Sequence, residues 1–249
     1  MKIIDILEPE ILVREKDFLI VYKPPRMHSA PLANSRGKNI MDWCAQKNPE
    51  VMDLPGRKPG EGGLLHRLDY ETCGLLLIAR TMFGMESLLA QQNEGKIIKE
   101  YSAVTAESEI KLSGFPAKKP ELAIDFYRDK IDAIKPVIVE SAFRPYGPGR
   151  KAVRPVLYDT ENRTISASEF YKTEILESQV LSSGYVSFRL RILRGFRHQI
   201  RCHLAWLGVP IINDSLYGGI SSGDGFLALK ACSLFFSDPL SGEKVSFSI

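Results

Sequence analysis

The segment LLHRLDYETCGLLLIAR, residues 64–80, places a polar cluster between two apolar runs, and His66, Arg67 and Asp69 lie within four residues of one another. We predict strand, turn and strand over this segment, with Gly74 as a pivot. A carboxylate walled by leucines becomes neutral unless a cation lies close to it. The spacing alone is better explained by a structural role for Asp69 in a turn between two strands. A chemical role for Asp69 requires a cationic partner close to its carboxylate. In an extended segment, Arg67 points to the same side as Asp69.

The composition of the chain is that of an ordinary globular protein. It has 249 residues, of which 44% are hydrophobic and 25% charged, and a net charge of +3. This small positive excess permits a nucleic-acid partner but does not require one. The four cysteines form no CxxC pair, and the N-terminus lacks the apolar core of a signal peptide, so we expect free thiols and a cytoplasmic location. No apolar run approaches the roughly 20 residues that span a bilayer, so we expect no membrane partner.

Periodicity and end signals predict many strands and few helices. We expect a hairpin over 11–22, a short helix capped by Asn39, a helix from Thr81 to Asn93 with Phe83, Leu88 and Leu89 inward, a helix over 197–207, and strands over 97–104, 136–144, 168–176, 185–193, 226–230 and 243–249. The elements show no βαβ rhythm. We therefore predict an α+β fold, with a central mixed, mostly antiparallel sheet flanked by helices and loops, as a single domain over residues 1–249.

Two further stretches carry polar side chains on apolar elements. Lys99 and Tyr101 share one face of the strand over 97–104, where an edge strand with a solvated lysine is the simpler interpretation. In RGFRHQIRCHLAWLGVPIINDSLYGG, residues 194–219, His198 and Arg201 are three apart and share a helix face. A basic helix face in water explains that pair about as well as a functional site does.

Standard metal and phosphate sites are not indicated by the sequence. His198 and His203 are five residues apart and have no third ligand nearby, so a zinc site is not expected. The chain has no Walker loop, no GxGxxG after a strand and no GxSxG elbow. Core packing is the better interpretation of Cys202.

Five blocks of the chain follow one another in a fixed order: VYKPP at 21–25, HRLDYETCGLLLIAR at 66–80, KEYSAV at 99–104, RHQIRCHLAWLGVPIINDSLYG at 197–218 and LALKACSLFFSDPLSGEKVSF at 227–247. This series resembles the motifs of the RluA-type pseudouridine synthases. The resemblance extends from about residue 10 to the end of the chain, and only residues 105–182 lack a firm match. Each block is weak alone, but their joint order is specific.

The resemblance implies a pseudouridine synthase fold and the isomerisation of uridines in ribosomal or transfer RNA to pseudouridine, without a cofactor or a metal. It assigns the catalytic aspartate to Asp69, the active-site tyrosine to Tyr101 and the arginine that pairs with the aspartate to Arg201. The residues expected to contact RNA are His66, Arg67, Lys99, Arg197 and His198, and Arg67 matches the arginine thought to help extrude the target base.

Some positions depart from the family pattern. Cys73 replaces a serine, Arg26 replaces the glycine after Lys-Pro-Pro, and Asn213 replaces the glycine before an aspartate; Phe196 and Arg197 stand where the family usually shows Arg and a small or basic residue. None of these positions is catalytic, so the departures bear on the choice of substrate. We expect a monomer, with no S4-like domain before the first motif.

The implied chemistry needs an ionised carboxylate, and a guanidinium can keep it ionised through two parallel hydrogen bonds. We therefore expect Arg201 to lower the pKa of Asp69, and Tyr101 to stack on the extruded base. Two other functions are considered. A glycosidase needs two carboxylates, and Asp214 is the candidate for the second, although its Asn-Asp turn favours a structural role. The other is a catalytically inactive RNA-binding module of the same fold.

Overall fold

The computed structural model describes residues 6–32, 37–108, 112–116, 136–157, 169–181 and 184–249. The chain divides into two compact units. The first unit contains residues 2–100 and 230–249, and the second contains residues 101–229. The expectation of one catalytic domain over the whole chain stays a prediction, because two compact units can belong to one domain.

The first unit is built on a mixed sheet. Its strands, in spatial order, are β1 (Glu10–Arg14), β2 (Phe18–Lys23), β3 (Cys73–Ala79), β9 (Leu229–Ser237) and β10 (Lys244–Ser248). All of these neighbours are antiparallel except β3 and β9, which pair in parallel at Cys73 and Gly74. Gly74 has φ of 120°, and a Cβ there would lie 2.2 Å from the carbonyl oxygen of Ala231. The predicted pivot is therefore a point of close backbone approach that only glycine permits.

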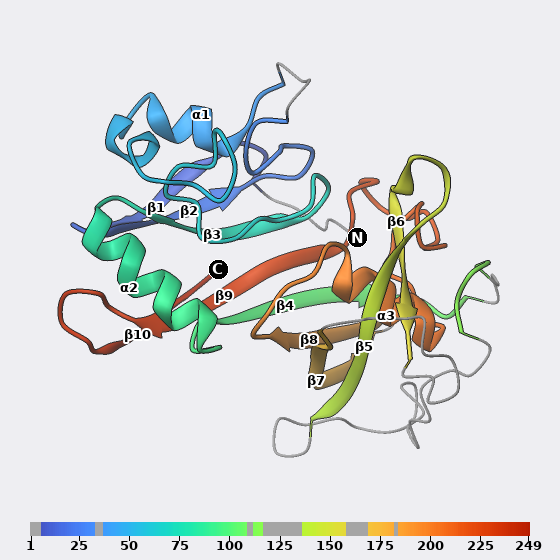
Figure 1. Ribbon diagram of the computed structural model, residues 1–249. Coiled ribbons are helices and arrows are strands. Elements are labelled where there is room, and N and C mark those ends of the chain that lie inside the picture. The colour runs from blue at the N-terminus through green and yellow to red at the C-terminus, as the bar shows by residue number, and fades with distance from the viewer. Residues whose placement is uncertain (1–5, 33–36, 109–111, 117–135, 158–168, 182–183) are drawn as a thin grey trace. The chain divides into compact units, whose positions relative to one another are not determined.

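The two α-helices of the first unit, α1 (Ile40–Ala45) and α2 (Met82–Asn93), begin where the sequence predicts. The 3₁₀ turn η1 (Pro49–Met52), which the sequence does not predict, lies between them. The Thr81 hydroxyl accepts from the Gly84 N–H at 3.0 Å, and the Asn39 side chain caps α1 in the same way. Helix α2 packs against β3 (Figure 1).

The expected inward position of Phe83 is wrong. Its side chain is 55% exposed, whereas Met85 and Leu88 are buried. Gly84 sets this rotation, because a Cβ there would lie 2.4 Å from the Asp17 carbonyl oxygen. The helix therefore approaches the sheet through its glycine, and the neighbouring phenylalanine turns toward solvent.

The core of the first unit forms around β2 and β3, which are buried along their whole length. Such continuous apolar runs mark strands covered on both faces. The buried cluster consists of Phe18, Ile20, Leu54, Leu65, Leu75, Leu77, Ala79, Met85, Leu88, Ile97, Leu234 and Phe236.

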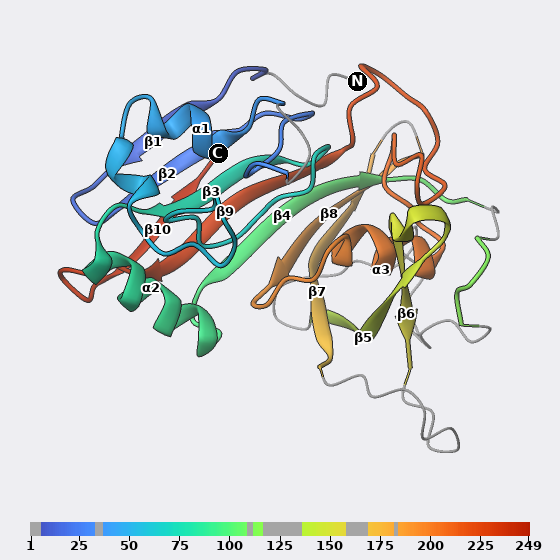
Figure 2. The same cartoon turned by 45° about the horizontal axis from the view of Figure 1, so that its top comes forward.

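The second unit contains β4 (Ile98–Thr105) from Tyr101 onward, then β8 (Val186–Ile192), β7 (Tyr171–Val180), β5 (Val137–Tyr146) and β6 (Ala152–Val156), in that spatial order. The pairs β5–β6, β5–β7 and β7–β8 are antiparallel, and the turn η2 (Pro148–Arg150) joins β5 to β6. Helix α3 (Gln199–Leu207) packs on β6 and β7, beside the β5–β6 hairpin (Figure 2). The left-handed Gly208 ends it, as the sequence predicts.

The predicted α+β class with a mixed, mostly antiparallel sheet is confirmed. Strand β8 alternates buried and more exposed residues along its length, as its sequence pattern requires. The predicted strand over 226–230 is misplaced, since β9 begins at Leu229 and continues to Ser237. Among the residues that the structure describes, no helix is long and apolar enough to cross a membrane.

Candidate active site

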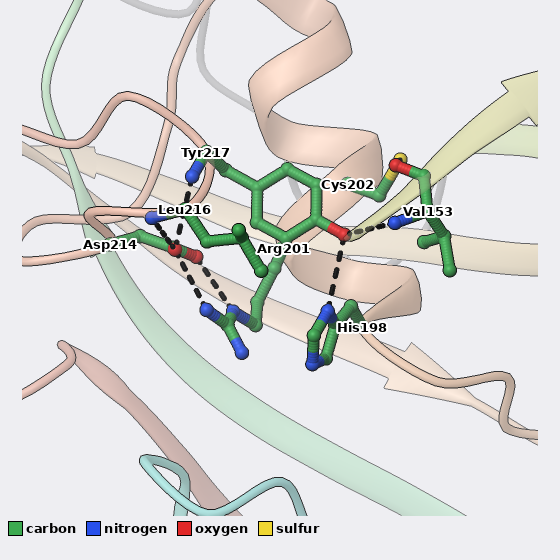
Figure 3. A network of polar contacts seen from close by, with 7 residues as sticks. All are labelled: Val153, His198, Arg201, Cys202, Asp214, Leu216 and Tyr217. Carbon is green, nitrogen blue, oxygen red and sulfur yellow. Dashed lines mark hydrogen bonds and ion pairs between the residues drawn. The ribbon is translucent and has the colours of Figure 1, made fainter. Parts of the chain in front are cut away.

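A buried arginine–aspartate pair lies at the start of α3 in the second unit (Figure 3). The Arg201 Nε donates to Asp214 Oδ2 at 2.7 Å, and its Nη2 donates to Asp214 Oδ1 at 2.8 Å. The two side chains are 7% and 0% exposed. The Asp214 carboxylate also accepts from the backbone N–H groups of Leu216 and Tyr217. Both buried charges are thereby compensated and hydrogen-bonded, which is the condition for burying them.

The pair corrects one expectation and confirms another. Arg201 is only 6% exposed, so it does not belong to a solvated basic helix face. Asp214 has its carboxylate committed to Arg201 and two backbone groups, so the structural role that its turn favours is confirmed. It is therefore not placed to act as the second carboxylate of a glycosidase.

The turn that delivers Asp214 depends on Asn213. This residue has φ of 64°, a left-handed conformation that asparagine tolerates better than most side chains. Its amide donates to the carbonyls of Ser222 and Phe226, and its oxygen accepts from the Ser222 N–H. The replacement of the family glycine thus keeps the backbone conformation and adds a side chain that holds the following loop.

Tyr217 joins this pair to the rest of the second unit. Its hydroxyl accepts from the Val153 N–H on β6 at 2.9 Å and contacts His198 Nδ1 at 3.2 Å (Figure 3). The Arg201 guanidinium lies over the tyrosine ring, 5.4 Å from its centroid. Burial raises the pKa of Tyr217, so its hydroxyl stays protonated. The sequence alone does not point to Tyr217, although this residue stands in the SLYG end of the fourth block.

His198 and Arg201 do meet, but not on one helix face. His198 precedes α3 and has a left-handed φ of 56°, whereas Arg201 lies in the first helical turn. The two side chains converge on Tyr217, one at its hydroxyl and the other over its ring. Left-handed conformations of non-glycine residues are costly and occur often at functional sites.

In the first unit, the segment that carries Asp69 is a loop pinned by side chains. Apart from one bridge between Leu64 and Ile78, residues 64–72 form no strand, so the predicted first strand is wrong. The Ser29 hydroxyl donates to the Leu68 carbonyl and accepts from the Leu68 N–H, both at 3.0 Å. Because these side-chain bonds satisfy the backbone, a neighbouring strand is not needed.

Lys23, at the end of β2, is a second anchor of this loop. Its buried ammonium donates to the carbonyl oxygens of Pro24 at 2.9 Å, Met27 at 2.7 Å and Tyr70 at 3.2 Å. Burial lowers the pKa of Lys23 to about 7, against the opposing effect of nearby acids that include Asp69. In the sequence, the one sign of this role is the lysine of VYKPP. The sign is weak, because a long lysine side chain can be buried or lie at the surface.

The candidate catalytic residues belong to both units. Asp69 is half-buried in the first unit, and Tyr101 is 6% exposed in the second. Tyr101 and Ala103 are both buried while Ser102 and Val104 are less so, which agrees with the shared strand face expected there. The pairing of Asp69 with Arg201 stays a prediction.

The predicted RNA contacts of the first unit differ in exposure and charge. Arg67 is 56% exposed and pairs with Glu61 at 3.2 Å. His66 Nε2 accepts from the Leu77 N–H, and burial lowers the pKa of His66 to about 3, so it is neutral near pH 7. Lys99 is 4% exposed, and burial lowers its pKa to about 8. The solvated-lysine interpretation of Lys99 is therefore wrong.

Arg197 and Phe196 attach the start of α3 to the β5–β6 hairpin. Arg197 Nη2 donates to the Arg150 carbonyl at 2.7 Å and to the Ala152 carbonyl at 3.2 Å. The Phe196 ring stacks on Phe143 with centroids 5.1 Å apart. Phe196, which departs from the family pattern, thus packs against the β5–β6 hairpin.

No cluster of metal-binding side chains occurs among the residues described by the structure. His203, one of the histidines weighed for zinc, lies fully buried between Ser141 and Thr173 and is hydrogen-bonded to both hydroxyls. Cys202 is fully buried in the cluster formed with Ala152, Val153 and Tyr217, as the sequence predicts.

The chain is similar to known proteins over most of its length. The chain is 29% identical over 98% of its length to an uncharacterized RNA pseudouridine synthase of Helicobacter pylori strain J99, covering 66% of that protein. It is 27% identical over 85% of its length to the ribosomal large subunit pseudouridine synthase D of Buchnera aphidicola, covering 55% of it. The chain therefore spans less than two thirds of the length of these relatives.

Solved structures show the same fold. The human RNA pseudouridylate synthase domain containing 1 superposes with a TM-score of 0.59 and 22% identity, covering 100% of this chain and 86% of that one. Residues 17–206 match the family model described as RNA pseudouridylate synthase. With this match over most of its length, the chain belongs to the RNA pseudouridylate synthase family, as its RluA-type motifs predicted.

Proposed function

We propose that this protein is an RNA pseudouridine synthase that isomerises specific uridines in ribosomal or transfer RNA. The observation that carries the proposal is the family match over residues 17–206, together with an Asp69 whose loop is held by a buried ammonium. Relatives named as ribosomal large subunit enzymes favour ribosomal RNA as the first substrate class to test.

Asp69 is the proposed catalytic carboxylate. In this isomerisation the bond between ribose and the uracil N1 breaks, the base turns, and a bond from the ribose to its C5 carbon forms, while C5 loses a proton and N1 gains one. Atoms are conserved overall, so the reaction consumes no cofactor. A carboxylate near the sugar serves as a nucleophile or as a base, and both roles require its ionised form.

Arg201 and Tyr101 are the proposed partners of Asp69. Two nitrogens of the Arg201 guanidinium are fixed on Asp214, which sets the orientation of its plane. Asp214 is thus a positioning residue for Arg201. Tyr101 supplies a ring on which the extruded base stacks, and this stacking contributes about 1–3 kcal/mol, which offsets the cost of unstacking.

The RNA itself is proposed to contact His66, Arg67, Lys99, Arg197 and His198. The exposed Arg67 suits a phosphate contact. The half-buried His66 and the buried Lys99 suit contacts with the extruded base, because a phosphate diester would remain in solvent. The protein is proposed to act as a monomer.

A tritium-release assay tests the proposal. RNA carrying tritium at C5 of uridine is incubated with the protein, and release of tritium reports the new carbon–carbon bond. Asp69→Ala is expected to abolish release, whereas Asp53→Asn, a change at an exposed acid elsewhere in the first unit, should leave it intact. Binding of RNA without any release by the native protein would instead identify an inactive RNA-binding module.

The substrate is identified by comparing cells with and without the gene. Pseudouridines are mapped across ribosomal and transfer RNA in both. A uridine that is modified only when the gene is present, and that is restored by the native protein but not by Asp69→Ala, is the target. Unchanged maps in every RNA would contradict the proposed substrate classes.

A further inference from the structure

Arg26 occupies a backbone conformation that disfavours it. It follows β2 in the turn after Pro25 and has φ of 57°, a left-handed value that glycine adopts readily and bulky residues rarely do. The related motifs usually place glycine here, so this chain keeps the conformation and adds a guanidinium. Strain of this kind persists when the surrounding structure enforces it, and it is frequent at binding sites.

The turn that carries Arg26 is joined to the loop that carries Asp69. The buried Lys23 ammonium bonds the carbonyls of both Met27 and Tyr70, so one side chain ties the two segments together. The rings of His28 and Tyr70 also lie against each other, with centroids 4.7 Å apart. Arg26 therefore has a fixed place beside the loop of the proposed catalytic carboxylate.

The Arg26 side chain lies at the exposed rim of this pair of loops. Its Nε is 3.6 Å from Glu71 Oε2, and the two side chains are 53% and 39% exposed. Glu71 is two residues after Asp69. A solvated ion pair at such a distance contributes little to stability.

We propose that Arg26 binds a phosphate of the substrate RNA beside the target uridine, and that Glu71 holds the guanidinium in position until the RNA arrives. This inference rests on the proposed function. A guanidinium matches phosphate oxygens through paired hydrogen bonds. The arriving phosphate replaces the Glu71 carboxylate, so the acid competes with RNA for the same donor.

Because Glu71 and RNA compete for Arg26, substitutions of Arg26 and of Glu71 should change the RNA affinity in opposite directions. Substitutions in a purely structural ion pair should not. We expect Arg26→Gly to weaken the binding of a fluorescein-labelled uridine-rich RNA about 5- to 10-fold at low salt, and to reduce the salt slope by about 0.7, the value for one phosphate contact on a single strand. Glu71→Gln should tighten binding about 2- to 5-fold, because it removes the competitor.

Catalysis and folding provide the internal checks. Arg26→Gly should raise KM in the tritium-release assay while changing kcat less than about twofold, because uniform binding is lost. Its melting temperature should be unchanged or higher, because glycine relieves the left-handed strain. A matched pair of controls, Arg189→Ala and Glu177→Gln, alters an exposed ion pair of 2.8 Å in the second unit.

The outcomes separate this inference from the proposed function. If Arg26→Gly and Glu71→Gln shift the RNA affinity in the same direction, or if Arg26→Gly leaves the affinity unchanged in an active protein, Arg26 is not a phosphate contact. An equal loss with Arg189→Ala would show a general effect of charge and would also overturn it. Absence of RNA binding and tritium release in the native protein would refute the proposed function instead.

Discussion

The buried Lys23 ammonium makes the stability of the protein depend on pH. Burial lowers the folded-state pKa of Lys23 to about 7 from an ordinary value of 10.5. Above pH 7 the folded state loses this proton while the unfolded state keeps it, so the free energy of unfolding rises with pH. The rise from this one group is at most about 1.4 kcal/mol per pH unit.

Urea unfolding at pH 6, 7.5 and 9 measures this dependence. The native protein should gain stability relative to Lys23→Met between pH 7 and 9, by about 2 kcal/mol. Lys244→Met, a change at an exposed lysine on β10, is the control. A constant difference between the native protein and Lys23→Met across this range would contradict the buried titration.

The pair formed by Arg201 and Asp214 is expected to be required for folding as well as for activity. Arg201→Ala would strand the Asp214 carboxylate, which is fully buried, and should lower the free energy of unfolding by about 3–5 kcal/mol. The sequence predicts Asp69 as a partner of Arg201, and that pairing stays a prediction; the bidentate partner in the structure is Asp214.

Urea unfolding of Arg201→Ala, Asp214→Asn and the double variant Arg201→Met/Asp214→Leu checks this. The double variant should recover part of the loss, because no buried charge then remains unpaired. Arg191→Ala removes a more exposed arginine, 3.6 Å from Glu174, and should cost less than about 1 kcal/mol. Equal small losses in all single variants would show that the buried pair is not important for stability.

At the scale of elements, the β5–β6 hairpin depends on side chains from outside it. Arg197 holds the carbonyls of Arg150 and Ala152, and Tyr217 accepts the Val153 N–H. The tip itself is exposed and contains Gly147 and Gly149, both with positive φ. A hairpin of this kind opens locally when its tethers are removed.

Arg197→Ala should therefore make the hairpin tip more susceptible to trypsin, which cleaves after Arg150 and Lys151. We expect the cleavage rate at the tip to increase about 10-fold, which corresponds to the loss of about 1.4 kcal/mol of local stability from charge-assisted hydrogen bonds. Arg144→Ala, which removes a bond to the Gly114 carbonyl, is the control at the base of the tip. An unchanged cleavage rate in Arg197→Ala would show that Arg197 does not hold the hairpin.

At the scale of the whole molecule, the distribution of cysteines predicts how the native protein reacts with thiol reagents. Cys44, Cys73 and Cys202 are buried, and only Cys232 is partly accessible. Burial raises the pKa of all four thiols, that of Cys44 to about 12. Because the thiolate is the reactive form, native cysteines should react slowly.

Titration with a disulfide reagent at pH 8 should modify at most Cys232 in the native protein within minutes, and all four thiols in denaturant. Cys232→Ser should remove the native reaction. Rapid modification of several thiols in the native protein would contradict this prediction and indicate that its core opens readily.

The sequence by itself determined the α+β class, the family and the order of most elements. Caps such as Thr81, the end signal Gly208 and the alternation along β8 act over a few neighbouring residues, so they can be recognised locally. The joint order of the motifs was enough to name Asp69, Tyr101 and Arg201 as candidates, and their roles stay predictions.

Only the tertiary structure decided which groups meet. Arg201 takes Asp214 thirteen residues away, and Lys23 reaches the Tyr70 carbonyl across 47 residues. The loop around Asp69 fits the apolar pattern of a strand, yet at Leu68 and Tyr70 side-chain bonds from Ser29 and Lys23 take the place of strand pairing. Local spacing sets the element that a residue joins, whereas the packing of distant segments sets its partner and its charge state.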